Sequence, residues 1–193
     1  MKKFRAHVSG SPGIPMLTHN ERLADARDPI ARAMKAISSK RVKTDEDLSE
    51  LARLEFEGGL YLTADGKVGI PAWNLFRSWQ DGAKVNRLGK SVERGIFMTG
   101  DAVLPIDYPG PKTPVEMWNA GYVDSRSVKV QTSKVTRTRP SFPDWSVDAE
   151  FIVDTDVLSV DDLAMITRNA GLMCGLGDYR PRFGRYEVEL EAL

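Results

Sequence analysis

The sequence is short of the residues on which catalytic and metal centres most often depend. It has one cysteine, Cys174, and two histidines, His7 and His19, among 193 residues. A single cysteine cannot form an internal disulfide, and structural zinc sites usually take four Cys or His ligands. We therefore expect no disulfide framework and no metal site, and the lack of disulfides favours a cytoplasmic protein. No run of 18 apolar residues occurs, so no membrane span is expected.

Signatures of common enzyme classes are also missing from the sequence. No phosphate-loop or dinucleotide fingerprint follows a strand-like segment. Cys174 ends an apolar helical stretch and is interpreted as a buried structural thiol. The acids at 45–47 lie in the first turn of a predicted helix, where they offset the helix dipole. We predict a protein that is not an enzyme, with no catalytic residue and no cofactor; a metal-dependent nuclease is an alternative that no residue favours.

The chain also lacks a net charge, but its acidic and basic residues are segregated along the sequence. The 27 basic residues balance the 27 acidic ones. Residues 121–140 hold five basic side chains against Asp124, whereas residues 144–162 hold seven acids and no base. Two interpretations stay open: solvated faces that balance each other, or a neutral protein with one basic groove.

Hydrophobic periodicity predicts six core elements in a recognisable order. Strand-like alternation and helical stripes give strand 3–9, helix 71–84, strand 95–106 with a bend at Gly100, strand 145–153, helix 159–174 and strand 184–190. This order is βαββαβ, the ferredoxin-like pattern of an α+β fold. We predict one antiparallel sheet with both helices on one face.

Two segments are predicted to be inserted into this core, within a single domain over residues 1–193. Residues 21–57 form a helical insertion, in which Asp28 precedes Pro29 at one helix start and Thr44 caps another. Residues 122–140 hold two strand-like runs that predict a basic β-hairpin. The Pro- and Gly-rich stretch 107–121 is expected to be irregular.

The segment 171–186, GLMCGLGDYRPRFGRY, combines glycines, arginines and aromatic residues. Glycine lets a backbone approach a phosphate closely, arginine grips phosphate with two hydrogen bonds, and aromatic rings stack on bases. The alternative is a structural loop whose arginines pair with the acidic block at 144–162. We expect Gly177 to sit where no side chain is tolerated, Phe183 to be buried and Tyr179 to be exposed.

Three segments together resemble the RAMP superfamily, the ferredoxin-like subunits that form the backbone of CRISPR effector complexes. GLGDYRPRFGRYEVEL is similar to the family's glycine-rich loop before the last strand, and VGIPAWNLFRSWQDGAK to the start of its first core helix. VDSRSVKVQTSKV followed by WSVDAEFIV is similar to its basic hairpin and third core strand. Ala72-Trp73-Asn74 departs from the family's small Gly-Ser-Ser run. The GLGDYRPRFGR ending also resembles small proteins of tailed bacteriophages, which would place this protein in the host cytoplasm.

The resemblance implies an RRM- or RAMP-like domain that binds single-stranded nucleic acid, RNA or DNA, as a homo-oligomer or filament stacked head to tail. Carried over to this sequence, the binding residues would be Arg77 on the first core helix, Arg126, Lys129, Lys134, Arg137 and Arg139 in the hairpin, and Gly177, Tyr179, Arg180, Arg182 and Arg185 in the loop. No catalytic residue of the family's ribonucleases has a counterpart here. A phage structural or assembly protein and a RAMP-type ribonuclease are the alternative functions.

Overall fold

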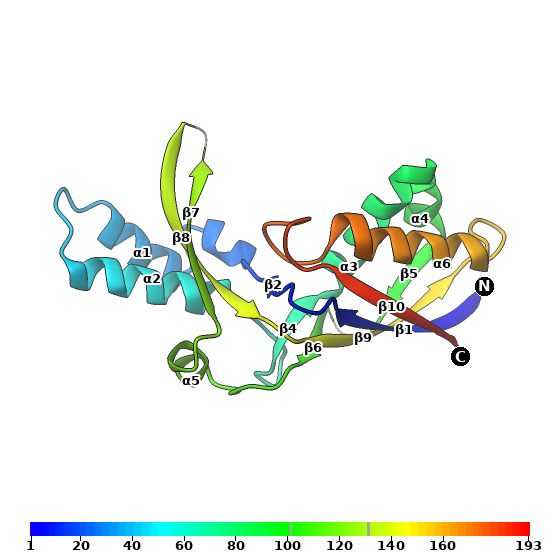
Figure 1. The fold of residues 1–193 in the computed structure, drawn as a ribbon, viewed down its shortest axis with the longest axis horizontal. Coiled ribbons are helices and arrows are strands. Elements are labelled where there is room, and N and C mark those ends of the chain that lie inside the picture. Colours follow the sequence, from blue (N-terminus) through cyan, green and yellow to red (C-terminus); the bar gives the residue numbers. More distant parts are fainter. Residues whose placement is uncertain (101, 131) are drawn as a thin grey trace. The chain divides into compact units, whose positions relative to one another are not determined.

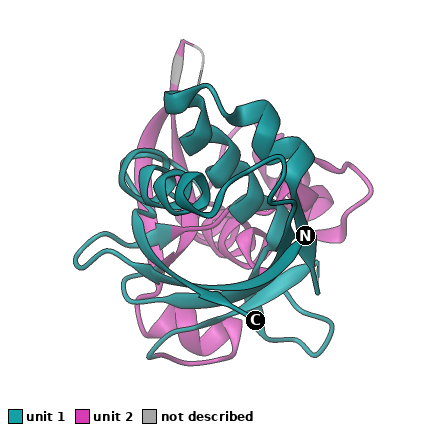
Figure 2. Cartoon of the chain, turned by 90° about the vertical axis from the view of Figure 1, so that its right-hand side faces the viewer, with its two compact units in different colours: residues 1–16, 62–109, 142–193 teal, residues 17–61, 110–141 magenta. Residues whose placement is uncertain are grey.

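The chain forms two compact units (Figure 2). The computed structural model describes residues 1–100, 102–130 and 132–193. Unit 1 comprises residues 1–16, 62–109 and 142–193, and unit 2 comprises residues 17–61 and 110–141. Both chain termini therefore belong to unit 1, and unit 2 consists of two segments that leave unit 1 and return to it.

Unit 1 is built on an antiparallel sheet that contains the strand order of a ferredoxin-like fold. Its four core strands are β1 (Lys2–Gly10), β5 (Ile96–Thr99), β9 (Ser146–Val153) and β10 (Tyr186–Ala192). β1 pairs with β10 on one side and β9 on the other, and β9 pairs with β5. The resulting order β10-β1-β9-β5 confirms the predicted α+β class and its βαββαβ core.

The sheet is extended beyond β9 by a second group of strands. They are β6 (Val103–Asp107), β4 (Val68–Pro71) and β3 (Tyr61–Leu62), in that order. The strand predicted over 95–106 is split into β5 and β6, which pair with different parts of β9. Gly100 follows β5 with a φ of 101°, a backbone region that glycine adopts without a steric penalty.

Two core helices cover one face of this sheet (Figure 1). They are α3 (Ala72–Ala83) and α6 (Val160–Asn169), the latter continued by a π-helical turn at Ala170–Cys174. The predicted apolar stripe of α3 is buried, and the Trp79 ring lies 4.9 Å from that of Phe151 on β9. A short turn (Lys84–Asn86) and α4 (Gly89–Gly95) follow α3. None of the helices described has both the length and the apolar character that crossing a bilayer requires.

The opposite face of the sheet, here called the outer face, carries charged side chains. Lys3 and Arg5 of β1 pair with Glu150 of β9 at 2.7 and 2.9 Å, and His7 lies 2.8 Å from Asp148. On β10 the exposed residues Glu187, Glu189 and Glu191 stand opposite Ser9, His7 and Arg5 of β1. The acids of these three strands outnumber the bases, so the outer face is acidic.

Unit 2 contains the predicted helices and the predicted hairpin. Its elements are β2 (Met16–Leu17), a 3-10 turn (Glu21–Ala24), α1 (Pro29–Ser38), α2 (Asp45–Gly59), α5 (Pro114–Asn119), β7 (Val123–Val130) and β8 (Ser133–Phe142), with strand order β2-β8-β7. The Asp28 side chain accepts hydrogen bonds at the start of α1, and Thr44 forms a capping box with Asp47 at the start of α2. Both predicted helix starts are confirmed, whereas α5 shows that the stretch 107–121 is not irregular throughout.

A buried carboxylate ties α2 to the hairpin within unit 2. Glu55 is 4% exposed. Its oxygens accept hydrogen bonds from the Arg137 guanidinium and from the backbone N–H of Thr138, each at 2.9 Å. Because a buried carboxylate needs such partners, Glu55 positions this part of β8.

Candidate nucleic-acid interface

The glycine-rich loop, residues 175–185, joins the π-helical turn after α6 to β10. Gly175, Gly177 and Gly184 have φ values of 73°, 80° and 69°. A Cβ on Gly184 would lie 1.8 Å from the Leu176 carbonyl oxygen, and a Cβ on Gly171 would lie 2.0 Å from that of Tyr186. The positive φ of Gly177 agrees with the sequence prediction, whereas Gly171 and Gly184 are required because backbone packs against backbone inside the unit. These two glycines therefore do not indicate a close approach to phosphate.

A buried hydroxyl pair fixes the loop to α3. The Ser78 hydroxyl donates to the Gly175 carbonyl at 2.8 Å, and its oxygen lies 2.8 Å from the Tyr186 hydroxyl. Because serine has one proton to donate, the Tyr186 hydroxyl donates to Ser78. Burial raises the pKa of Tyr186, so the phenol keeps this proton. These two hydrogen bonds hold the start of the loop, at Gly175, and the start of β10, at Tyr186, against α3.

Three cations converge on one carboxylate where the loop meets α3. The Lys84 ammonium lies 2.6 Å from Asp81, the Arg180 guanidinium 3.2 Å and the Arg77 guanidinium 3.9 Å. Partial burial opposes ionisation of Asp81, but the hydrogen bond from Lys84 and the neighbouring positive charges outweigh it and lower its pKa. We call Arg77, Asp81, Lys84 and Arg180 the Asp81 cluster. One ionised carboxylate does not neutralise three cations, so the cluster is positively charged.

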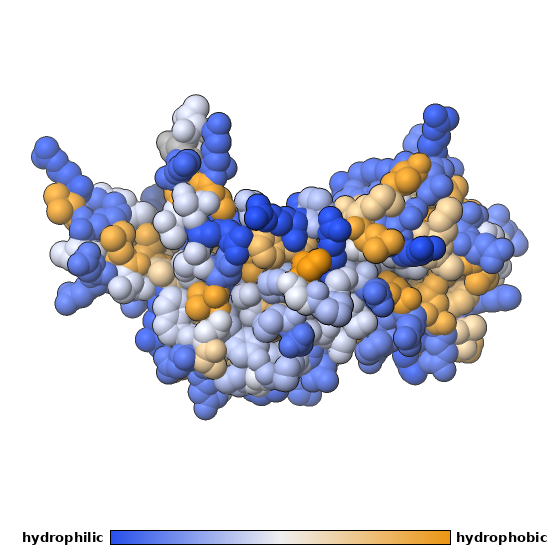
Figure 3. Space-filling view, viewed as in Figure 1, coloured by the Kyte–Doolittle hydropathy of each residue, from blue (hydrophilic) through white to orange (hydrophobic). Residues whose placement is uncertain are grey.

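The rest of the loop adds charge and an aromatic surface beside this cluster. Arg182 and Arg185 are exposed and form no ion pair with any described residue. Tyr179 is 39% exposed and its ring stacks on Phe183, which is 8% exposed, with the centroids 5.6 Å apart. The burial of Phe183 and the exposure of Tyr179 are as predicted. Strongly hydrophilic side chains gather over this loop in Figure 3.

The loop arginines do not pair with the acidic strand, which was the structural alternative. Arg180 bonds to Asp81 on α3. The acids of β9 are engaged instead by β1, Asp148 by His7 and Glu150 by Arg5 and Lys3. Arg180 and these acids of β9 therefore have separate ion-pair partners.

The five cations in the hairpin of unit 2 differ in their exposure and in their ion pairs. Arg126 pairs with Asp124, Arg137 pairs with Glu55 at 2.9 Å, and Arg139 is only 8% exposed. Lys129 and Lys134 stand directly opposite each other in the β7–β8 ladder, are exposed and form no ion pair among the described residues. Of the five cations named in the sequence analysis, these two lysines are therefore the most accessible, whereas Arg126 and Arg137 already have ion-pair partners in the unit; that the hairpin binds nucleic acid stays a prediction.

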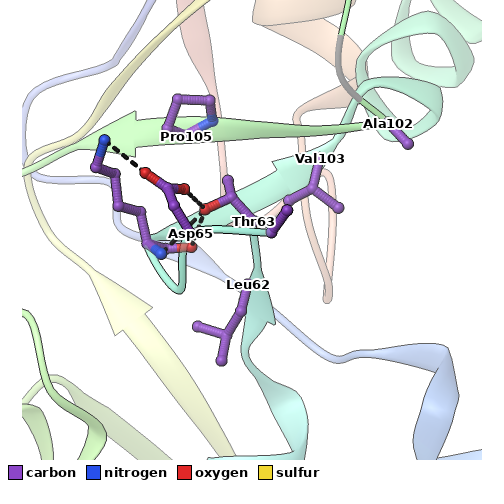
Figure 4. Close-up of a pocket in the computed structure, with 8 residues that line it drawn as sticks. Leu62, Thr63, Asp65, Ala102, Val103 and Pro105 are labelled. Atoms are coloured by element: carbon purple, nitrogen blue, oxygen red, sulfur yellow. Dashed lines mark hydrogen bonds and ion pairs between the residues drawn. The ribbon is translucent and has the colours of Figure 1, made fainter.

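A hollow of about 480 Å³ elsewhere in unit 1 is a weaker candidate (Figure 4). It lies between the β3–β4 turn and β6. Its polar side chains bind one another: Thr63 donates to Asp65, and Lys67 lies 2.8 Å from Asp65. The charges of Asp65 and Lys67 cancel, so these two residues leave the hollow without a net charge that attracts an ionic ligand. The Asp81 cluster, by contrast, is positively charged.

Sequence reasoning missed Asp81 and Lys84, although a signal for both was present. Arg77 and Asp81 are four residues apart, and Asp81 and Lys84 are three apart, on the predicted helix 71–84. Residues at these spacings are neighbours on a helix surface. The recruitment of Arg180 had no such signal, because it lies 99 residues from Asp81 in the sequence.

No group of three or more metal-ligating side chains is arranged to hold an ion within the described residues. The search for a matching protein-family model finds none, and no curated protein matches the chain. Thirty-seven chains of solved structures match. One is a chain in the cryo-EM structure of the type III-B Cmr-beta bound to cognate target RNA, with a TM-score of 0.48 and 13% sequence identity. The match covers all of this chain and 61% of the other, so this protein spans about three fifths of that neighbour's length.

Proposed function

We propose that this protein binds single-stranded nucleic acid without catalysing a reaction on it, and that the glycine-rich loop and the Asp81 cluster form the contact surface. The observation that carries the proposal is the convergence of Arg77, Lys84 and Arg180 on the single carboxylate of Asp81. Cations gathered at one place attract the phosphate backbone and release its counterions. The segments that resemble the RAMP superfamily imply the same ligand.

Two further features support a single strand as the ligand. The exposed Tyr179 ring is supported from behind by Phe183 and offers a surface on which an unpaired base can stack. Bases inside a duplex are already stacked and do not reach such a ring. The acidic outer face of the sheet repels phosphate, which favours a strand lying on the helix-covered side of unit 1. Head-to-tail assembly of several copies along one strand is part of the proposal.

The test is a binding titration followed by fluorescence anisotropy. A labelled single-stranded RNA, the matching DNA and their duplex are titrated at several salt concentrations. We expect both single strands to bind, with an affinity whose logarithm falls linearly with the logarithm of salt by about 0.7 per neutralised phosphate. Equal or tighter binding of the duplex, or assembly into regular particles without nucleic acid, would contradict the proposal. Loss of the probe itself would indicate a nuclease.

Replacing Arg182 by alanine is expected to weaken single-strand binding about 5- to 150-fold, the loss that follows from removing a charged hydrogen bond of about 1–3 kcal/mol. The salt slope should fall by about 0.7. Since Arg182 forms no ion pair among the described residues, the melting temperature should not change. Arg41→Ala removes the same charge from an exposed position in unit 2 and should bind like the wild type. A lower melting temperature with unchanged affinity would show that Arg182 is structural.

The hairpin lysines are expected to make non-specific backbone contacts. Lys129→Ala combined with Lys134→Ala should weaken binding to all sequences alike and reduce the salt slope by up to about 0.7 for each lost contact. Arg137→Ala serves as the comparison, because this arginine is paired with Glu55 and its loss should lower stability. Wild-type affinity of the double variant at moderate salt would exclude the hairpin from the contact surface.

A further inference from the structure

Trp73 is an exposed tryptophan at the start of α3 that the interface above does not use. Its side chain is 63% exposed, the largest exposed fraction of any tryptophan, tyrosine or phenylalanine among the described residues. Its ring stacks on Phe76, with centroids 4.9 Å apart and planes 21° from parallel. Phe76 is itself buried. The indole is therefore supported on one face and open on the other.

The residues that follow Trp73 along this side of the helix are polar or cationic. Asn74 and Gln80 are half-buried, and Arg77 and Lys84 are exposed. Arg77 lies one turn from Trp73 and belongs to the Asp81 cluster. One exposed ring with a cation, Arg77, one turn away is smaller than the contiguous apolar patch that a protein partner usually covers. The surroundings suit a ligand that has both an aromatic face and negative charge.

The distance from Trp73 to the cluster suits one continuous strand. Eight residues separate Trp73 from Asp81, which is about 12 Å along a helix. A stacked strand advances about 3.4 Å per nucleotide, so this distance corresponds to three or four nucleotides. The resemblance does not explain the residue, because the segment departs from the family's small Gly-Ser-Ser run at this position.

We infer that Trp73 is a second base-stacking platform, on which one base of a single strand rests while the backbone of that strand follows α3 to the Asp81 cluster. This inference rests on the proposed function. The open face of the indole receives the base, and Arg77 contacts the adjacent phosphate. An exposed ring is also suited to contact with a second copy of the chain, and the experiment distinguishes that contact from base stacking.

The experiment compares two single-stranded probes of equal length, an oligonucleotide with bases and one in which every nucleotide is abasic. Trp73→Ala should weaken binding of the base-bearing probe about 5- to 150-fold. Binding of the abasic probe should stay within about twofold of the wild type, because only phosphate contacts hold it. Phe97→Ala removes another exposed aromatic ring, 45% exposed on β5, and should leave both affinities unchanged.

Tryptophan emission gives a second readout that folding defects do not imitate. Trp79 and Trp145 are buried and Trp118 is half-buried, so Trp73 is the tryptophan best placed to report contact with a base. The base-bearing probe should quench the wild-type emission and the abasic probe should not. Trp73→Phe keeps a stacking ring and should retain most of the affinity while losing the quenching.

The outcomes separate this inference from the proposed function. If the wild type binds neither probe, both fail. If it binds both probes with a steep salt dependence but Trp73→Ala binds like the wild type, or loses affinity for both probes equally, only the stacking inference is overturned. A wild-type dimer that Trp73→Ala dissociates in the absence of any probe would likewise overturn it, because a second copy would then cover the ring.

Discussion

Replacing Gly184 by alanine is expected to lower the free energy of unfolding by about 3–5 kcal/mol, through left-handed strain and steric overlap together. Gly184 has a φ of 69°, and an added Cβ would lie 1.8 Å from the Leu176 carbonyl oxygen. The residue cannot move aside easily, because its N–H donates to Pro15 and its carbonyl accepts from Leu176, at 2.9 and 2.8 Å. In a chain of this size, the melting temperature should fall by roughly 6–20 °C.

Gly66→Ala is the matched control for that variant. Gly66 has a φ of 80°, but nothing lies within 4 Å of an added Cβ. Gly66→Ala should therefore lower the free energy of unfolding only through left-handed backbone strain, by about 1–2 kcal/mol. Thermal and urea unfolding of both variants separates strain from overlap. Equal losses for the two variants would mean that the backbone around Leu176 yields, and that Gly184 is retained for its φ alone.

Replacing Glu55 by alanine is expected to destabilise the protein by about 2–4 kcal/mol. The change leaves the buried Thr138 N–H without its acceptor and the Arg137 guanidinium without its counter-charge. We expect a loss of stability toward the lower end of what breaking a buried ion pair costs, because Arg137 is itself 39% exposed. Hydrogen exchange should show the largest loss of protection in β8.

The comparison for Glu55 lies on the same helix. Glu57 pairs with Arg53 at 3.3 Å, but both side chains are substantially exposed. Glu57→Ala should therefore cost less than about 0.5 kcal/mol. A double-mutant cycle between Glu55→Ala and Arg137→Ala measures the coupling directly. If the two changes are additive, Glu55 does not act through Arg137.

The core could be predicted from the sequence because its signals are local and repeated. Alternation in 145–153 and the helical stripe in 71–84 each involve many side chains, and both elements form where expected. The helices α4 and α5 have seven and six residues, too few to show a periodic stripe. Gly100 was correctly located as a bend, but the pattern did not show that β6 would also pair with β4.

The candidate site was predictable in its residue types and not in its partners. Glycines, arginines and Tyr179 in one short segment identified the loop. Arg180 finds Asp81 through the packing of the loop on α3, and Arg137 finds Glu55 from 82 residues away. Such pairings depend on tertiary structure, so composition alone could not tell a cation held within the unit from one available to a ligand. The support of the Trp73 ring by Phe76 became evident only in three dimensions.

The acidic outer face also has a consequence for how the molecule can be handled. Glu187, Glu189 and Glu191 alternate along β10, stay exposed and belong to the outer face, whereas α3 lies over the other face of the sheet (Figure 1). A fluorophore or surface tether attached through this strand would lie where phosphate is repelled. Protein immobilised in this way would keep its helix-covered side open to solution, so that a sensor signal reports ligand capture rather than obstruction by the attachment.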